Sequence, residues 1–346
     1  MRCLTLANEL ARQGHECHFV CREHPGNLGH LIASQGHGLT ILPAPANHSP
    51  QEKDTASEDY ALWLGVPWQE DARQTLDVIS PLKPDWLVVD HYALDAKWEC
   101  TLASVVGDIM VIDDLADRPH ECTLLLDQNL GRDASHYGGL LPGKCQLLIG
   151  PRYALLRPEF AALRERSLQR RKNPKLRRVL VSLGGIDQNN LTGQVLDALK
   201  ESSLSADAEL DVVMGACAPN LEEVRRIAAE LPFSSTVSVS VMDMADRMCH
   251  ADLSIGAAGG TSWERCCLGI PSVIIVIAHN QLQGAAALRD ARAAVVIENL
   301  NELKKELLRA IEEFSEVSAL TSVSENASRI SDGYGCRNIV QKICGF

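Results

Sequence analysis

ADLSIGAAGGTSWERCCLGIPSVIIVIAHNQ, residues 251–281, is the stretch that decides the fold. Leu253 to Ile255 predict a buried strand, a glycine turn follows, and the next segment predicts a helix. Gly269 and Pro271 end that helix, and a second apolar strand begins at Ser272. This order of strand, turn, helix and strand is typical of a doubly wound parallel sheet.

The glycine turn in this stretch has the composition of a phosphate site. Gly256, Gly259 and Gly260 carry no side chain that would obstruct an approaching phosphate. Either Thr261 or Ser262 is expected to cap the helix that follows. We therefore expect this turn to bind an anion.

Polar residues in the predicted helix and after the next strand suggest that the anion belongs to a nucleotide. Glu264 falls in the first helical turn, where its carboxylate can accept hydrogen bonds from a ribose diol. Asn280 and Gln281 follow the next strand, at the sheet edge where open α/β sheets bind ligands. The competing interpretation is an ordinary glycine turn with a helix-start glutamate, since glycine motifs are weak signals without their structural context.

A second glycine turn follows another predicted strand. The N–H groups of Gly184 and Gly185 are placed to approach a phosphate or a sugar. Asp187 follows in the same turn, and a carboxylate beside a diphosphate would be repelled. For Asp187 we therefore expect helix capping or a contact with a sugar hydroxyl.

The chain alternates strands and helices along its whole length of 346 residues, which suits two domains. We expect one Rossmann-like domain over residues 1–152 and another over 153–346, with a linker helix near 158–172 and a polar surface loop at 47–59. The predicted strands of the first domain are 17–21, 39–42, 86–90, 109–112, 123–126 and 146–149; those of the second are 178–183, 210–214, 235–239, 252–255, 271–275 and 294–297.

The composition excludes several classes of binding partner. A net charge of −12 predicts no nucleic-acid surface, and the longest apolar run is too short for a membrane anchor. The twelve cysteines include no CxxC pair, which favours reduced thiols and a cytoplasmic location. His15, Cys17, His18 and Cys21 fit a core strand better than a metal site, so no metal and no cofactor are expected. We expect a monomer.

Several motifs, in this order along the chain, resemble the PseG family of UDP-2,4-diacetamido-2,4,6-trideoxy-β-L-altropyranose hydrolases, which act in pseudaminic acid biosynthesis. The wider MurG-type glycosyltransferases of GT-B fold are similar mainly in the second domain. The motifs are VVDHYALD (88–95), IDDLADRPHECTLLLDQN (112–129), YALLRPEF (153–160), LVSLGGIDQNNLT (180–192), MADRMCHADLSIGAAGGTSWERCCLGIPS (244–272) and DGYGCRNIV (332–340).

The resemblance implies a GT-B fold in which a UDP-sugar lies between two Rossmann-like domains and UDP is held mainly by the second. It implies water attack at the anomeric carbon with departure of UDP, and a sugar-side or water-side role for Tyr92. Asp90 and His91 share the strand end of Tyr92, where α/β enzymes display functional groups, so we expect them to be catalytic residues together with Tyr92. On the nucleotide side it implies substrate contacts for Asn190 and Asn280 and a ribose contact for Glu264.

The family's pattern also places a strand and a G-x-G-H loop, whose histidine is the proposed base, before the first residues of this sequence. The chain begins directly in a predicted helix, so we expect this first strand and the principal histidine to lie upstream of Met1. Two alternatives to a UDP-sugar hydrolase stay open. They are a GT-B glycosyltransferase that uses a UDP-sugar and a sugar-nucleotide-binding protein without catalysis.

Overall fold

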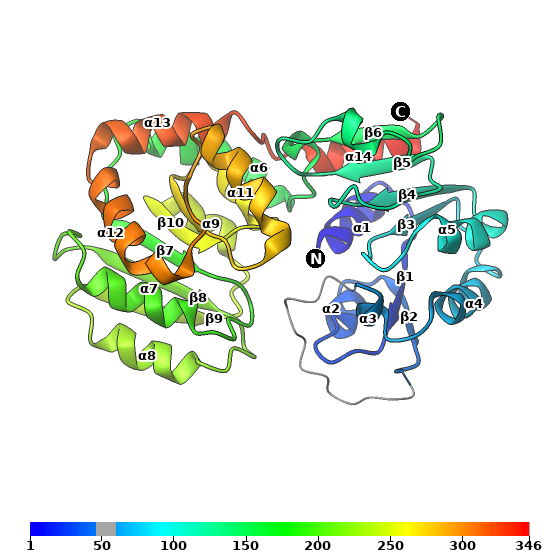
Figure 1. Ribbon diagram of the computed structural model, residues 1–346, viewed down its shortest axis with the longest axis horizontal. Helices are drawn as coiled ribbons and strands as arrows, with labels where there is room; N and C mark the ends of the chain where they lie inside the picture. The colour runs from blue at the N-terminus through cyan, green and yellow to red at the C-terminus, as the bar shows by residue number, and fades with distance from the viewer. Residues whose placement is uncertain (46–59, 346) are drawn as a thin grey trace. The chain divides into compact units, whose positions relative to one another are not determined.

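The computed structural model describes residues 1–45 and 60–345, in two compact units (Figure 1). Unit 1 comprises Met1–Leu155 and Gly335–Phe346, and unit 2 comprises Leu156–Tyr334. The surface loop expected at 47–59 lies outside the described residues. The expected division into 1–152 and 153–346 differs from these units at the C-terminus, because the last helix buries its apolar face in the core of unit 1.

Unit 1 contains two parallel sheets, one of order β1-β2 and one of order β3-β4-β5-β6. The strands are β1 (His18–Arg22), β2 (Gly38–Leu42), β3 (Trp86–Val89), β4 (Asp108–Ile112), β5 (Leu124–Asp127) and β6 (Gln146–Ile149). The helices are α1 (Arg2–Arg12), α2 (Gly29–Ser34), α3 (Ala61–Leu64), α4 (Trp68–Ile79), α5 (Ala96–Leu102) and α14 (Gly335–Cys344). The strand expected before α1 stays a prediction.

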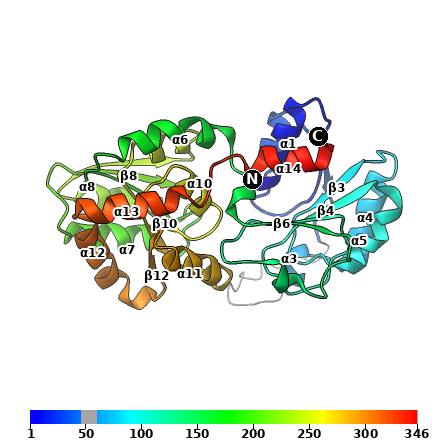
Figure 2. The same cartoon turned by 90° about the horizontal axis from the view of Figure 1, so that it is seen from above.

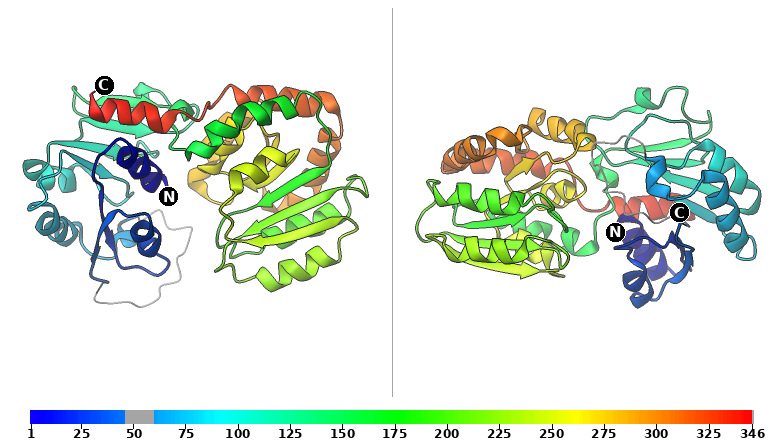
Figure 3. Two further views of the ribbon diagram at one scale, coloured as in Figure 1. Left: turned by 180° about the vertical axis from the view of Figure 1, so that it is seen from behind. Right: turned by 60° about the horizontal axis from the view of Figure 1, so that its bottom comes forward.

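Alternate residues of the larger sheet face two different helix layers, as the period of two in a strand requires. In β4, Met110 and Ile112 pack with apolar residues of α1 and α14, whereas Ile109 and Val111 pack with those of α4 and α5. The sheet is therefore covered on both faces (Figure 2). Figure 3 shows α14, in red, lying beside α1, in blue, so the two ends of the chain form one helix layer.

Unit 2 has one six-stranded parallel sheet of order β12-β11-β10-β7-β8-β9. Its strands are β7 (Arg178–Ser182), β8 (Glu209–Met214), β9 (Ser234–Val239), β10 (Leu253–Ala257), β11 (Ser272–Ile275) and β12 (Val295–Ile297). Its helices are α6 (Pro158–Arg170), α7 (Leu191–Lys200), α8 (Leu221–Ala229), α9 (Met244–His250), α10 (Thr261–Cys267), α11 (Leu282–Asp290), α12 (Leu303–Phe314) and α13 (Val317–Ser328). Figure 2 shows α6 and α7 on opposite sides of these strands.

All twelve expected strands are present, with ends within two residues of the prediction, and the linker helix is α6. The strand ends could be predicted accurately because the strands are buried. In a parallel sheet covered on both faces the strands are short continuous apolar runs, and such runs end abruptly at polar or glycine turns. Both sheet systems therefore confirm the doubly wound α/β class.

The central β-strand of unit 2 offers a test of this burial. Ile255 in β10 is fully buried among the side chains of the main core, whereas Ile186 is 63% exposed. We expect Ile255→Ala to lower the free energy of unfolding of unit 2 by about 2–5 kcal/mol, because it removes buried methyl groups and leaves a cavity. The matched variant Ile186→Ala should change it by less than about 0.5 kcal/mol. Urea unfolding of both variants measures the difference, and equal shifts would contradict the assigned core.

Candidate functional site

The two glycine turns predicted from the sequence meet in unit 2. Strand β7 pairs in parallel with β10, with Ser182 opposite Gly256 at their carboxyl ends. From β7 the chain proceeds outward to β8 and β9, and from β10 it proceeds outward on the other side to β11 and β12. The turns after β7 and β10 therefore flank the point where strand order reverses, which is where doubly wound sheets bind ligands.

The turn after β10 presents unused backbone donors. Gly259 has φ +131°, which strongly favours glycine, and a Cβ on Gly260 would project into open space. The N–H groups of Gly259, Gly260 and Thr261 donate to no acceptor in the described part of the chain. Three successive N–H groups of this kind form a concave site suited to an anion.

The other turn is similarly open. Gly184 has φ +107°, and a Cβ on either Gly184 or Gly185 would meet no atom within 4 Å. Asp187 accepts hydrogen bonds from the N–H groups of Leu191 and Thr192 at 2.8 and 2.9 Å, so its carboxylate caps α7. The side chain of Asn190 is the N-cap of the same helix. These two polar residues therefore shape the turn.

Arg265 is the residue of this site that sequence reasoning missed. Its guanidinium is buried and donates to the carbonyl of Ala257 at 2.6 Å and to the hydroxyl of Ser262 at 3.1 Å. Burial lowers the pKa of Arg265 to about 10, which still leaves it charged at neutral pH. A positive charge therefore lies directly beneath the turn. No sequence signal singled it out, because Arg265 directly follows Glu264 in a helix that also contains Thr261 and Ser262.

Two expectations for this turn were wrong. A Cβ on Gly256 would lie 2.1 Å from a terminal nitrogen of Arg265, so this glycine makes room for the arginine rather than for a phosphate. Neither Thr261 nor Ser262 caps α10, whose N-cap is Gly260. Ser262 lies inside the first helical turn, where its buried hydroxyl bonds to Arg265 instead.

Glu264 occupies the predicted place in the first turn of α10. The side chain is half-buried, and no described residue donates a hydrogen bond to its carboxylate. Burial raises the pKa of Glu264 to about 7, and the positive charges of Arg157 and Arg265 oppose that rise. A carboxylate in this state has its acceptor positions open to a ligand.

The loop after β11 brings two predicted residues to the same edge of the sheet. The side-chain oxygen of Gln281 accepts a hydrogen bond from the N–H of Ile277 at 3.0 Å and closes the loop. Asn280 is exposed and makes no hydrogen bond with any residue that the structure describes. Asn280 is thus the member of the pair whose amide is available to a ligand.

In unit 1 an ion-pair cluster gathers at the carboxyl ends of β3 and β4. Arg2 of α1 donates to both carboxylate oxygens of Asp90, at 2.6 and 3.0 Å, and to Asp114 at 3.2 Å. Burial alone would raise the pKa of Asp90, but the hydrogen bonds and charge of Arg2 outweigh it and lower that pKa. Asp90 is therefore a weak base.

Its neighbours His91 and Tyr92 have different surroundings. Nδ1 of His91 accepts a hydrogen bond from the N–H of Ala93 at 3.1 Å, and burial lowers the pKa of the imidazole. The neutral ring therefore carries its proton on Nε2 and is a donor there. Burial, together with the nearby carboxylate of Asp114, raises the pKa of Tyr92.

Two further carboxylates of unit 1, Asp113 and Asp127, have structural contacts. Asp113 accepts from the N–H of Ala116 at 2.9 Å, and Asp127 accepts from the N–H of Asn129 at 2.8 Å and from the hydroxyl of Tyr137. Within residues 1–45 and 60–345, no group of three or more His, Cys, Asp or Glu side chains is arranged to hold a metal ion.

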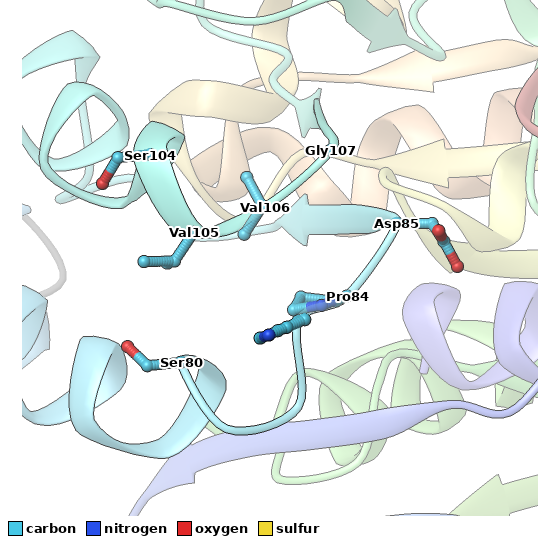
Figure 4. A pocket seen from close by; sticks show the side chains of 8 residues that line it. Ser80, Pro84, Asp85, Ser104, Val105, Val106 and Gly107 are labelled. Atoms are coloured by element: carbon cyan, nitrogen blue, oxygen red, sulfur yellow. The ribbon is translucent and has the colours of Figure 1, made fainter.

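Unit 1 also contains a hollow of about 430 Å³ (Figure 4). Its walls come from the residues that precede β3 and β4, namely Ser80, Lys83, Pro84, Asp85 and 104–107. It therefore lies at the amino ends of these strands. The Asp90 cluster is at their carboxyl ends, which is the edge that carries ligand sites in such sheets.

Comparison with known proteins gives similarities for both sequence and fold. Residues 178–333 match the family model of the glycosyltransferase family 28 C-terminal domain. The chain is 32% identical over 44% of its length to the spore coat polysaccharide biosynthesis protein SpsG of Bacillus subtilis, of which it covers 44%. It is 26% identical over 46% of its length to the UDP-2,4-diacetamido-2,4,6-trideoxy-β-L-altropyranose hydrolase of Campylobacter jejuni, of which it covers 54%. These matches span about half the length of the curated relatives.

Among solved structures, MurG of Acinetobacter baumannii is similar with a TM-score of 0.71 at 14% sequence identity. The superposition covers 100% of this chain and 95% of the MurG chain. The spinosyn rhamnosyltransferase SpnG has a TM-score of 0.61 at 16% identity, with coverages of 98% and 96%. The protein therefore has the GT-B fold, which confirms the predicted class. The residues that match the glycosyltransferase family 28 C-terminal domain lie within the second unit.

None of the helices in the described part of the chain combines the length and apolar character needed to cross a membrane.

The raised pKa of Glu264 makes stability depend on pH. The folded state favours the protonated carboxyl, so its contribution to stability is present below pH 4.5 and is lost as the pH rises to about 7. Relative to Glu264→Gln, we expect the wild-type free energy of unfolding to fall by on the order of 1–3 kcal/mol across this interval. Urea unfolding of both proteins between pH 4.5 and 8 measures it. Parallel pH profiles would show that Glu264 is not desolvated.

Proposed function

We propose that this protein binds a UDP-linked sugar, with the nucleotide held by unit 2. The observation that carries the proposal is the combination, at the switch point, of three unused N–H groups in the 259–261 turn with the half-buried, open carboxylate of Glu264. The N–H groups suit the diphosphate, and Arg265 adds positive charge beneath it. Glu264 suits the two hydroxyls of a ribose. Asn280 is proposed as a further substrate contact.

The proposed reaction is hydrolysis of a UDP-linked diacetamido-trideoxy sugar at its anomeric C–O bond, which yields UDP and the free sugar, as in pseudaminic acid biosynthesis. The similarity to the Campylobacter jejuni hydrolase supports this choice. UDP is a good leaving group. The protein therefore has to orient and deprotonate a water molecule, exclude bulk solvent and donate hydrogen bonds to the departing diphosphate.

In unit 1 we assign Tyr92 to the sugar or to the attacking water, because it follows the carboxyl end of β3 beside the ion-pair cluster of Arg2, Asp90 and Asp114. The contacts of Asp90 and His91 do not favour either as the base. Asp90 is neutralised by Arg2, and the Nδ1 lone pair of His91 is occupied by a backbone N–H. Their proposed role is to fix the position of Tyr92 at the end of β3.

A second candidate function is transfer of the sugar to an alcohol acceptor. The family 28 match favours it, as does 29% identity over 53% of the chain to a Bacteroides thetaiotaomicron UDP-N-acetylglucosamine transferase of pyrophosphoryl-undecaprenol acceptors. The same nucleotide site serves both reactions, because only the attacking oxygen differs.

Proton NMR distinguishes the two functions. The full chain is incubated separately with the UDP-linked diacetamido-trideoxy sugar and with UDP-N-acetylglucosamine, without an acceptor. If the protein is a hydrolase, UDP and the free sugar should appear in equal amounts as the UDP-sugar disappears. If both ligands bind but stay intact until an acceptor is added, the protein is a transferase. If UDP itself does not bind, the whole proposal fails.

Glu264 provides the test of the nucleotide site. We expect Glu264→Gln to weaken UDP binding by about 10- to 100-fold at pH 8, where the wild-type carboxylate is charged, because charge-assisted hydrogen bonds to the ribose are lost. Glu313→Gln removes the same charge from the exposed surface of α12 and should leave affinity unchanged. Isothermal titration with UDP measures both, and equal affinities for the two variants would rule out the ribose contact.

Tyr92 provides the test of the reaction. Tyr92→Phe keeps the ring but removes the hydroxyl that faces Asp114. We expect turnover of the UDP-sugar to fall by roughly 10- to 100-fold, while affinity for UDP is retained. Tyr334→Phe, at an exposed tyrosine, is the matched control. Unchanged turnover in Tyr92→Phe would remove this residue from the mechanism.

A further inference from the structure

Three aromatic side chains meet beside the Asp90 cluster in unit 1. The ring of Tyr92 lies 5.0 Å from that of Tyr60 and 6.0 Å from that of Trp63, measured between ring centroids. Tyr60 and Trp63 meet edge to face at 5.2 Å. Aromatic residues make up only 4% of the chain, so this concentration is unusual for the molecule. We call these three residues the aromatic platform.

The platform has a buried support and a partly exposed indole. Leu64, the last residue of α3, is buried in the core of unit 1 and holds the short helix in place. Gly65 ends the helix with φ +79°. Trp63 is nevertheless 46% exposed. A half-exposed indole held on a fixed support is an apolar surface available to a ligand.

Polar groups converge on one side of this apolar surface. The carboxylate of Asp114 pairs with Arg2 at 3.2 Å, and Arg2 also pairs with Asp90. The side chains of Arg2, Asp90 and Asp114 keep 28%, 24% and 21% of their surface exposed. An aromatic wall with a few convergent polar groups is the usual composition of a small-molecule site.

We infer that the aromatic platform binds the pyranose ring of a sugar, with Trp63 as its principal contact. The polarised C–H bonds of such a ring pack against aromatic faces, and its hydroxyl or acetamido groups reach the Tyr92, Asp114 and Arg2 groups. This assignment rests on the proposed function and deepens it, because it names the residues that recognise the sugar rather than the nucleotide.

The local charge favours a sugar over a nucleotide at this place. The cluster contributes two carboxylates, Asp90 and Asp114, and one guanidinium, Arg2. These opposite charges are already paired with one another, so the cluster offers a diphosphate little net attraction, whereas neutral hydroxyl and amide groups hydrogen-bond to both kinds of partner. The phosphate-binding features lie instead in unit 2.

The experiment compares three variants of the full chain, Trp63→Ala, Trp63→Phe and Leu62→Ala. Leu62 is the adjacent residue and is 61% exposed, so Leu62→Ala controls for loss of exposed apolar surface. Affinities are measured for UDP, for the UDP-sugar that wild type binds more tightly, and for its free sugar. Saturation-transfer NMR identifies the ligand protons in contact.

We expect Trp63→Ala to weaken UDP-sugar binding by about tenfold while UDP binding is unchanged. Trp63→Phe should retain most of the affinity and Leu62→Ala all of it. Equal affinity of wild type and Trp63→Ala for the UDP-sugar would overturn the inference, as would equal weakening of UDP and UDP-sugar, which indicates a nucleobase contact or misfolding.

The free sugar separates this inference from the proposed function. If wild type does not bind UDP but binds the free sugar through Trp63, the proposed function fails and the platform stands as a sugar site. If UDP binds but Trp63→Ala has the same affinity as wild type for both the UDP-sugar and the free sugar, the nucleotide site is supported and the sugar site at the platform is ruled out. Wild type that binds none of the ligands refutes both.

Discussion

The parallel pairing of β10 with β7 is the constraint on which the candidate site depends. Both faces of a parallel sheet must be covered by helices, so the connections leave the carboxyl ends of the strands in opposite directions at the reversal point. The turns after β7 and β10 are therefore brought side by side with no helix between them. Gly184 and Gly259 adopt backbone conformations there that few other residues tolerate, and the N–H groups of the β10 turn have no acceptor among residues 1–45 and 60–345.

The charged groups at the candidate sites differ between the two units. Unit 2 places a buried guanidinium, Arg265, directly under the glycine turn, and Gly256 is the residue that makes space for it. In unit 1, Arg2 is outnumbered by Asp90 and Asp114, and the aromatic platform lies beside them. The first place favours an anion, whereas the second combines paired charges with an aromatic surface. This difference is the physical basis for assigning the nucleotide to one unit and the sugar to the other.

Sequence patterns located the turns and most of the polar residues correctly, but not the partners of those residues. Glu264 lies in the first turn of its helix as predicted, and Asn280 follows its strand. Gly256 was assigned to the phosphate, and Ser262 was expected to cap the helix. Both instead serve Arg265, because the arginine side chain folds back over β10 into the interior. No local pattern reveals such a contact, since an arginine beside a glutamate normally indicates an exposed helix face.

The sequence by itself determined the α/β class, the positions of twelve strands and the two glycine turns, because these depend on short apolar runs and on the conformational freedom of glycine. Only the tertiary structure decided that the last helix belongs with the first unit, that Asp90 is neutralised by Arg2, and that Tyr60, Trp63 and Tyr92 meet. Each of these contacts joins segments distant in the sequence. They arise from the packing of whole helices and strands, and a local pattern does not encode that packing.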